Sequence, residues 1–133
     1  MNRNEIAELI GLVRGDAIAY NEVNKARFHV LGKKILRVVA KELGLQKGTY
    51  DIRSNMAGIA VSGEITLHSE HLYIDLSQGG VEGMFMYRSC RGRKDYVGGH
   101  NQWMGWINLS DLYGYAIPAF KGVIERASSV AVG

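Results

Sequence analysis

Apolar residues recur at three- and four-residue spacing through the first 44 residues, which is the periodicity of one helix face. They fall into two runs separated by a polar stretch at residues 21–24. The runs consist of Ile6, Leu9, Ile10, Val13 and Ala17, followed by Phe28, Leu31, Ile35, Val38, Val39 and Leu43. Residues 1–44 are therefore predicted to form an amphipathic helical arm, which Gly44 and Gly48 end.

Two arrangements of this arm fit the pattern. The first is a helical hairpin that turns near residues 21–25. The second is a single helix of ~40 residues, about 60 Å long at a rise of 1.5 Å per residue. A helix of that length cannot bury its apolar stripe against so small a domain, so it would need a partner chain. With the arm in either form, we expect a homo-oligomer.

The middle of the chain alternates apolar and polar residues, which is typical of β-strands. A two-residue turn at Ser69 and Glu70 would place every apolar residue of a hairpin on one face. This register pairs Leu67 with Leu72, Ile65 with Ile74, Thr66 with Tyr73, His68 with His71, and Glu64 with Asp75. Further strands are predicted at residues 50–55 and 83–91.

The remaining patterns complete an α+β prediction for a single domain spanning residues 1–133. In the strand at 83–91, we expect Met84, Met86 and Cys90 to face the core. Ser110 is a candidate N-cap for a C-terminal helix over residues 110–127, with a kink or restart at Pro118. The predicted units are the helical arm (1–44), a small antiparallel β core with a glycine-rich basic loop (50–103), and this short helix (110–127).

Composition and charge narrow the class of protein. The chain has 133 residues, 47% of them hydrophobic, and one proline, which fits one folded domain. A net charge of +3 favours anionic partners, but mildly. The single cysteine excludes an internal disulfide. No signal-type segment or membrane-spanning apolar run occurs, so we expect a cytoplasmic protein that does not enter a membrane.

The densest functional chemistry lies between Tyr87 and Trp103. Four cations fall within seven residues there, among aromatic rings, glycines and amides. Guanidinium forks and exposed backbone N–H groups bind phosphate, and flat rings stack on bases. The candidate ligand-binding residues are Tyr87, Arg88, Arg91, Arg93, Lys94, Tyr96, Gly98, Gly99 and Asn101. The simpler alternative is a solvated hairpin loop whose charges only keep the protein soluble.

A second group of cations lies on the helical arm. A possible second anion site comprises Arg27, Lys33, Lys34 and Arg37. It would be strongest if several chains brought these side chains together. The alternative is a solvated helix face opposite the apolar stripe.

Three side-chain pairs are candidates for metal binding or catalysis. His68 and His71 would lie side by side, but zinc needs further ligands. Cys90 and His100 could form a nucleophile pair, although the strand pattern indicates a buried, inert thiol. Glu64 and Asp75 could act as an acid–base pair, with a structural salt bridge involving Arg53 as the alternative. We expect no metal, no cofactor and no catalytic residue.

Two stretches carry a resemblance to a known family: Leu76-Ser-Gln, and Met86-Tyr-Arg-Ser-Cys-Arg-Gly-Arg-Lys-Asp-Tyr-Val-Gly-Gly-His-Asn. They resemble small phage-encoded proteins, of which the nearest characterised group is the first-described Thoeris anti-defence family of phage sponges. The order of a helical arm, a glycine-rich β core and a short helix is similar too. The likeness is specific over about twenty residues and architectural elsewhere.

This resemblance implies a binding protein rather than an enzyme. Such proteins sequester cyclic ADP-ribose-type signals of bacterial immunity, some also hold cyclic oligonucleotides, and they assemble as oligomers. It implies that the cations meet the pyrophosphate, an aromatic ring stacks on adenine, and Asn101 bonds a base edge or ribose. The matching positions are Arg91, Arg93, Lys94, Tyr96, Gly98, Gly99 and Asn101. The second-choice function is a phage accessory protein that binds nucleic acid or protein.

Overall fold

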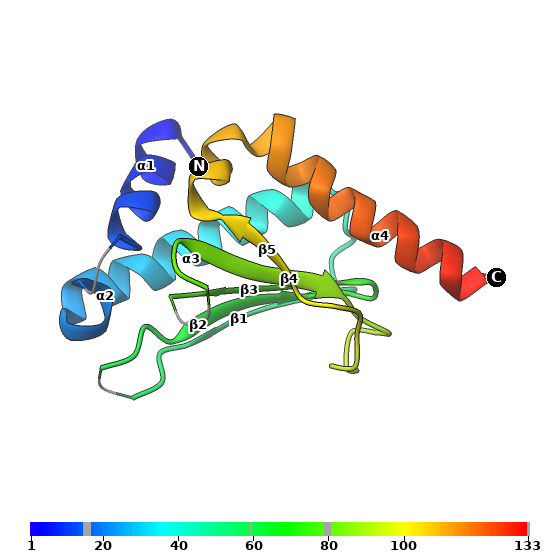
Figure 1. Cartoon of the computed structure of the whole chain (residues 1–133), viewed down its shortest axis with the longest axis horizontal. Helices are drawn as coiled ribbons and strands as arrows, with labels where there is room; N and C mark the ends of the chain where they lie inside the picture. The colour runs from blue at the N-terminus through cyan, green and yellow to red at the C-terminus, as the bar shows by residue number, and fades with distance from the viewer. Residues whose placement is uncertain (15–16, 59, 79–80, 133) are drawn as a thin grey trace.

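The computed structural model describes residues 1–14, 17–58, 60–78 and 81–132. Within them the chain forms an antiparallel sheet of five strands, with helices covering one face (Figure 1). This confirms the α+β class. The elements are α1 (Arg3–Leu12), α2 (Ala17–Tyr20), α3 (Glu22–Glu42), β1 (Asp51–Asn55), β2 (Glu64–His68), β3 (Leu72–Ser77), β4 (Met84–Ser89), β5 (Gln102–Gly105), the 3-10 helix η1 (Trp106–Asp111), the π-helix η2 (Leu112–Ala116) and α4 (Ile117–Val132).

The N-terminal arm is not one long helix, because α1 and α3 are separate helices that pack against each other. A helix break does fall in the predicted range, at Asn21, where α2 ends and α3 begins, and the chain has a further break after α1 ends at Leu12. The side chain of Asn21 caps α3 by accepting a hydrogen bond from the N–H of Asn24 at 3.1 Å, so residues 22–25 form the first helical turn. The stripe of α3 is buried within this chain, so the arm itself does not require a partner chain.

The sheet has the order β1-β2-β3-β4-β5, with every neighbouring pair antiparallel. The predicted hairpin joins β2 to β3, but its register is wrong by two positions: Leu67 lies opposite Ile74. Ser69 is the cause, since its N–H donates to the carbonyl of Leu72 at 2.9 Å, which moves the two-residue turn from residues 69–70 to residues 70–71. A shift of two keeps each side chain on its predicted face, because side chains alternate with a period of two.

The predicted inner face of β4 is also wrong. Ile74 of β3 lies opposite Tyr87, which places Tyr87 and Phe85 on the helix side, where they are 9% and 1% exposed. Met84 is on the other face and 38% exposed. Cys90, just after the strand, is buried as expected.

The C-terminal helix begins differently from the prediction. Asp111, not Ser110, provides the cap, because its carboxylate accepts a hydrogen bond from the N–H of Gly114 at 3.2 Å. The α-helix proper starts at Ile117, one residue before Pro118, which confirms the predicted restart. It continues to Val132, beyond the predicted end at residue 127. Among the described helices, none has the length and apolar character needed to span a membrane.

Aromatic rings join the helices to the sheet. The ring of Trp106 lies 6.0 Å from that of Phe28 on α3 and 5.1 Å from that of Phe85 on β4. Phe120 of α4 meets Tyr87 edge to face at 5.3 Å. Thus α3 covers β1 and β2, while α4 covers β3 and β4.

Candidate anion-binding site

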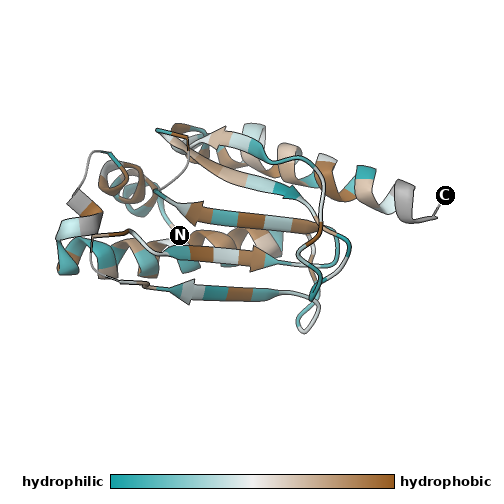
Figure 2. Ribbon diagram, turned by 60° about the horizontal axis from the view of Figure 1, so that its bottom comes forward, coloured by the Kyte–Doolittle hydropathy of each residue, from teal (hydrophilic) through white to brown (hydrophobic). Residues whose placement is uncertain are grey.

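The face of the sheet away from the helices is called the open face here. Figure 2 shows it with the helices behind. By the strand register it carries Asp51, Arg53, Asn55, Glu64, Thr66, His68, Tyr73, Asp75, Ser77, Met84, Met86, Arg88 and Trp103. These residues are mostly polar, so this face presents side chains that can form hydrogen bonds and ion pairs with a ligand.

Residues 91–101, called the basic loop here, connect β4 to β5 and fold as a compact hairpin. The N–H of Arg91 donates to the carbonyl of Val97 at 3.1 Å, and the N–H of Asp95 donates to the carbonyl of Gly92 at 3.1 Å. The carboxylate of Asp95 also accepts from the N–H of Val97 at 2.9 Å. The basic loop therefore has a defined conformation, which its own hydrogen bonds hold.

The basic loop is fastened across one end of the open face, from β4 to β1. The carbonyl of Gly92 lies 2.8 Å from Nε2 of His68 on β2. Arg93 grips Asp51 on β1 with two bonds of 2.8 Å each, and it also donates to the carbonyl of Gly48. The Arg93 guanidinium holds the pKa of the Asp51 carboxyl below its usual range. Arg93 is therefore occupied as a clamp and is not available to an anion.

We expect Asp51→Asn to loosen this clamp, since the variant removes the charge and keeps the size of the side chain. Amide hydrogen exchange at Asp95 should quicken about twofold to fivefold at low salt, and less at high salt. Glu125→Gln, which alters an exposed carboxylate on α4, is the control and should leave that exchange rate unchanged. An unchanged rate in Asp51→Asn would show that the ion pair does not hold the loop.

Aromatic contacts seat the loop on the sheet. The ring of Tyr96 lies 4.7 Å from that of His68 and 6.0 Å from that of Tyr73. The guanidinium of Arg88 lies 5.1 Å from the centre of the Tyr73 ring, in a cation–π contact. Burial raises the pKa of Tyr73 to about 12, so its hydroxyl stays protonated. Tyr96 is still 55% exposed, which leaves part of its ring accessible to a ligand.

The paired glycines of the loop are needed for close approach. A Cβ at Gly98 would lie 2.1 Å from the carbonyl oxygen of Ser89, and one at Gly99 would lie 2.6 Å from the Ser89 hydroxyl oxygen. The N–H of Gly99 also donates to that hydroxyl at 3.1 Å. Gly98 and Gly99 were predicted as ligand contacts. They also have a structural role, because only glycine lets the loop pack this closely on the end of β4.

Behind the loop, on the helix side, a hollow of about 360 Å³ lies between the ends of β4 and β5 and the helix α4. Two arginines from separate elements, Arg91 and Arg126, line it. Arg126 is close enough to Tyr87 to oppose the rise in the tyrosine's pKa that burial causes. The remaining lining residues are His71, Ser89, Gln102, Val123 and Ala127. This hollow, called the Arg91–Arg126 hollow below, combines two guanidinium groups with an imidazole, an amide and a hydroxyl.

The structure shows which of the residues predicted to bind ligand are accessible and which are buried. Arg91 lines the hollow, and Lys94 and Asn101 are exposed on the loop. Tyr87 lies in the core against Phe120, so its ring has no room for a ligand. Sequence reasoning missed Arg126, His71 and Gln102 as site residues. Only the packing of α4 over the sheet brings Arg126 to Arg91, and no sequence motif announces it.

The predicted second anion site on the helical arm is partly neutralised by acidic residues of α1. Arg27 makes two bonds to Glu8, of 2.6 and 3.0 Å, and Lys34 bonds Glu5 at 2.5 Å. Lys33 is half-buried, and Arg37 is exposed. Two of the four cations are therefore already neutralised within the chain.

The structure gives no support to the candidate His68–His71 metal pair or to Cys90 as a nucleophile. His68 and His71 are not opposite each other, because His68 pairs with Tyr73 on the open face and His71 lines the hollow. Burial raises the pKa of the Cys90 thiol to about 11, and the thiol donates to the carbonyl of Ser69. It is therefore not a thiolate near neutral pH. In the described part of the chain, no three His, Cys, Asp or Glu residues are placed to hold a metal ion.

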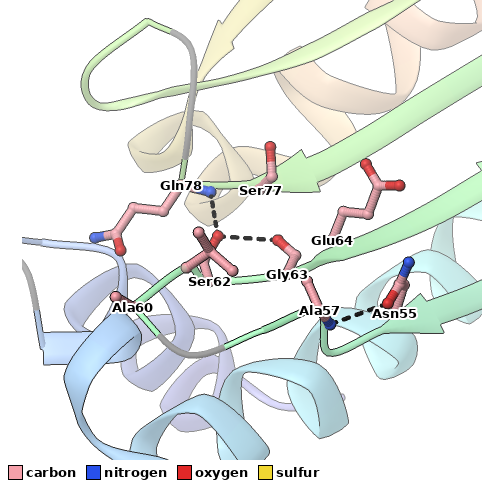
Figure 3. Close-up of a pocket in the computed structure, with 9 residues that line it drawn as sticks. Asn55, Ala57, Ala60, Ser62, Gly63, Glu64, Ser77 and Gln78 are labelled. Carbon is pink, nitrogen blue, oxygen red and sulfur yellow. Dashed lines mark hydrogen bonds between the residues drawn. The ribbon is translucent and has the colours of Figure 1, made fainter.

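A larger hollow, of about 500 Å³, lies at the end of the sheet where β1 meets β2 (Figure 3). Its polar groups largely serve the chain itself: the Ser62 hydroxyl accepts from the N–H of Gln78 at 3.0 Å and donates to the carbonyl of Gly63 at 2.9 Å. Its charged lining group is the carboxylate of Glu64. A negative charge disfavours an anion, so this hollow does not fit the ligand class that the basic loop suggests.

Comparison of the chain with protein-family models, curated proteins and solved structures gives no significant match.

Proposed function

We propose that this protein binds a small phosphate-bearing nucleotide in the Arg91–Arg126 hollow and sequesters it without converting it. The observation that carries the proposal is the convergence of two guanidinium groups, one from the basic loop and one from α4, on a single concave site. Guanidinium forks match phosphate oxygens in geometry and charge. The volume of about 360 Å³ is in the range of small-molecule sites.

The resemblance of residues 86–101 to the Thoeris anti-defence family supports a narrower form of the proposal. The ligand would be a cyclic ADP-ribose-type signal or a cyclic oligonucleotide. The protein would be phage-encoded and would block immune signalling in the cytoplasm of the infected bacterium. Because Arg93 is held by Asp51, we assign the phosphate contacts to Arg91 and Arg126. The Tyr96 ring, predicted to stack on adenine, packs on His68 and Tyr73 of the open face, so the proposal gives it no contact with a ligand in this hollow.

The binding proposal is tested by native mass spectrometry of the full chain with ADP, cyclic ADP-ribose and a set of cyclic dinucleotides. We expect stoichiometric binding of at least one of them and recovery of the intact ligand after heat denaturation. The same spectra report the oligomeric state, for which we propose a homo-oligomer. Cleaved ligand would replace sequestration with an enzymatic function.

Substitutions in the hollow should weaken binding of the same ligand. We expect Arg91→Gln and Arg126→Gln each to lower the affinity about tenfold, measured by titration calorimetry, because each removes one charge-assisted contact to phosphate. Matched controls are Arg53→Gln on the open face of β1 and Lys121→Gln, which is exposed on α4. Equal losses in the controls would assign the effect to net charge and would reject the hollow as the site.

The second candidate function is binding of single-stranded nucleic acid on the open face. It is favoured by the exposed rings of Tyr96 and Trp103, which are 55% and 38% exposed and lie on the same side of the sheet as Arg88. Successive bases stack on such rings while cations follow the phosphates. Affinity would then fall steeply with salt, and Trp103→Ala would weaken binding while Arg126→Gln would not.

A further inference from the structure

A second concave surface lies on the outer side of α1. The helices α1 and η1 border a groove of about 470 Å³. In Figure 1 the helix α1 lies at the end of the molecule away from the basic loop. The lining of the groove is mostly apolar, with Ser110 as a neutral polar residue, and it includes Arg3 at the start of α1 and Arg14 just past the end of that helix. The apolar lining is provided by Ile6, Ala7, Ile10, Gly11 and Ile107.

The groove is positively charged because α1 uses its acidic residues on its other side. Glu5 is paired with Lys34 and Glu8 with Arg27, both on α3. The lining of the groove itself contains no carboxylate within the described residues. An acidic side chain, Glu82, lines an adjoining hollow that shares Ile10, Arg14 and Ile107 with the groove.

The surface between the two arginines is apolar, and two of its residues on α1 are small. Ala7 and Gly11 are one helical turn apart and both are exposed. A Cβ at Gly11 would meet nothing within 4 Å, and Ile107 beside them is 57% exposed. Glycine inside a helix costs about 1 kcal/mol of stability relative to alanine. Gly11 therefore weakens α1, but it leaves no side chain projecting into the groove. A side chain or backbone from outside can therefore approach α1 closely.

From these observations we infer that the groove docks a short amphipathic helix of a partner protein, with acidic residues at both ends and apolar side chains between them. Arg3 begins α1 and Arg14 lies two residues beyond its end at Leu12, so the helix between them is about 14 Å long at 1.5 Å per residue. Helices of that length commonly bind in grooves through apolar anchors spaced three and four residues apart. This surface is separate from the nucleotide site, so it does not depend on the proposed function.

Charge argues against a second copy of this chain as the occupant. If two α1 helices packed through this face in parallel, Arg3 would meet Arg3. If they packed antiparallel, Arg3 would meet Arg14. Either contact places like charges together, whereas acidic ends on a partner would complement both arginines.

The test uses the full chain and two synthetic helical peptides of about 14 residues, identical in their leucine face but ended by glutamates in one and by lysines in the other. Fluorescence anisotropy at low salt should give an affinity for the glutamate peptide about tenfold above that for the lysine peptide. The double variant Arg3→Glu/Arg14→Glu should reverse this preference. Arg37→Glu/Arg53→Glu, with the same change in net charge outside the groove, should not reverse it.

Gly11→Leu separates docking from folding. Leucine raises helix propensity and fills the groove, so this variant should unfold at a higher temperature than the native chain and lose at least about tenfold in affinity for the glutamate peptide. The inference is overturned if neither peptide binds, if both bind equally, or if Gly11→Leu binds like the native chain. A concentration-dependent dimer that Arg3→Glu/Arg14→Glu abolishes would instead identify a second copy as the occupant.

Discussion

Alanine at Gly98 should lower the free energy of unfolding by about 2–3 kcal/mol, whereas alanine at Gly92 in the same loop should change it by less than about 0.5 kcal/mol. The new Cβ at Gly98 would lie 2.1 Å from the carbonyl oxygen of Ser89 and 2.4 Å from Nη1 of Arg88. At Gly92 the nearest atom within 4 Å is a carboxylate oxygen of Glu70, at 3.8 Å. The first contact is with backbone in a paired strand, which cannot yield without moving the loop or the end of β4.

Urea unfolding of both variants measures the difference, and nucleotide affinity shows its consequence for the site. If the loop lifts away from Ser89 in Gly98→Ala, Arg91 moves with it and affinity falls alongside stability. Gly92→Ala should bind as the native chain does. Equal stability of the two variants would show that the loop shifts freely, and that the close packing on β4 does not hold it.

The order of the main helices and of β1 to β4 could be predicted because their apolar residues recur with the period of a helix or a strand, whereas β5, η1 and η2 were not predicted. The stripe of α3, with Phe28, Leu31 and Ile35, repeats like a helix and is buried as a helix face. The hairpin of β2 and β3 was predicted on the correct faces. The register of this hairpin could not be predicted, because two registers that differ by two positions bury the same residues. The hydrogen bond that decides between them belongs to one serine, Ser69.

The inner face of β4 could not be predicted from its own pattern, because both faces carry apolar residues. Met84 and Met86 compete with Phe85 and Tyr87, and the choice depends on the neighbouring strand. Pairing of Ile74 with Tyr87 decides it, since residues directly opposite share a face.

The candidate site was predicted only in part, because sequence shows which cations are near one another and not which are already paired. In the sequence, Arg91 and Arg93 are equally good candidates for binding an anion. In the structure Arg93 is held by Asp51, which is 42 positions away, while Arg91 remains beside the hollow. The second guanidinium, on Arg126, comes from a helix whose packing site on the sheet has no local signature.

The carboxyl pair of Glu64 and Asp75 leads to the second large prediction. The two residues are diagonal neighbours, since Glu64 lies opposite Ser77 and Asp75 opposite Thr66. Burial first, and then the neighbouring Glu64 carboxyl, raise the pKa of Asp75 to about 7. Its Oδ1 is buried without a hydrogen-bond partner in the described structure. The expected salt bridge to Arg53 is not among the ion pairs of the described residues.

Asp75→Asn should therefore stabilise the protein, and only when the pH is high enough to ionise the native carboxyl. The pKa of Asp75 is about 7 in the folded chain against a reference of 3.8, so the folded state holds the proton more tightly. Native stability then falls as pH rises from about 4 to about 7, because the folded state binds more protons than the unfolded state in that window. At about pH 8 the asparagine variant should gain on the order of 2 kcal/mol, a figure reduced for the partial exposure of the group.

Urea unfolding of native protein, Asp75→Asn, Glu64→Gln and the double variant across pH 4 to 8 tests this account. The gain of Asp75→Asn should shrink toward pH 4, where the native carboxyl is protonated in the folded state. Glu64→Gln should give part of the same gain, and the double variant should give less than the sum, because both changes relieve one repulsion. A gain that is independent of pH would assign the effect to side-chain packing, and additive gains would show that the two carboxyls do not interact.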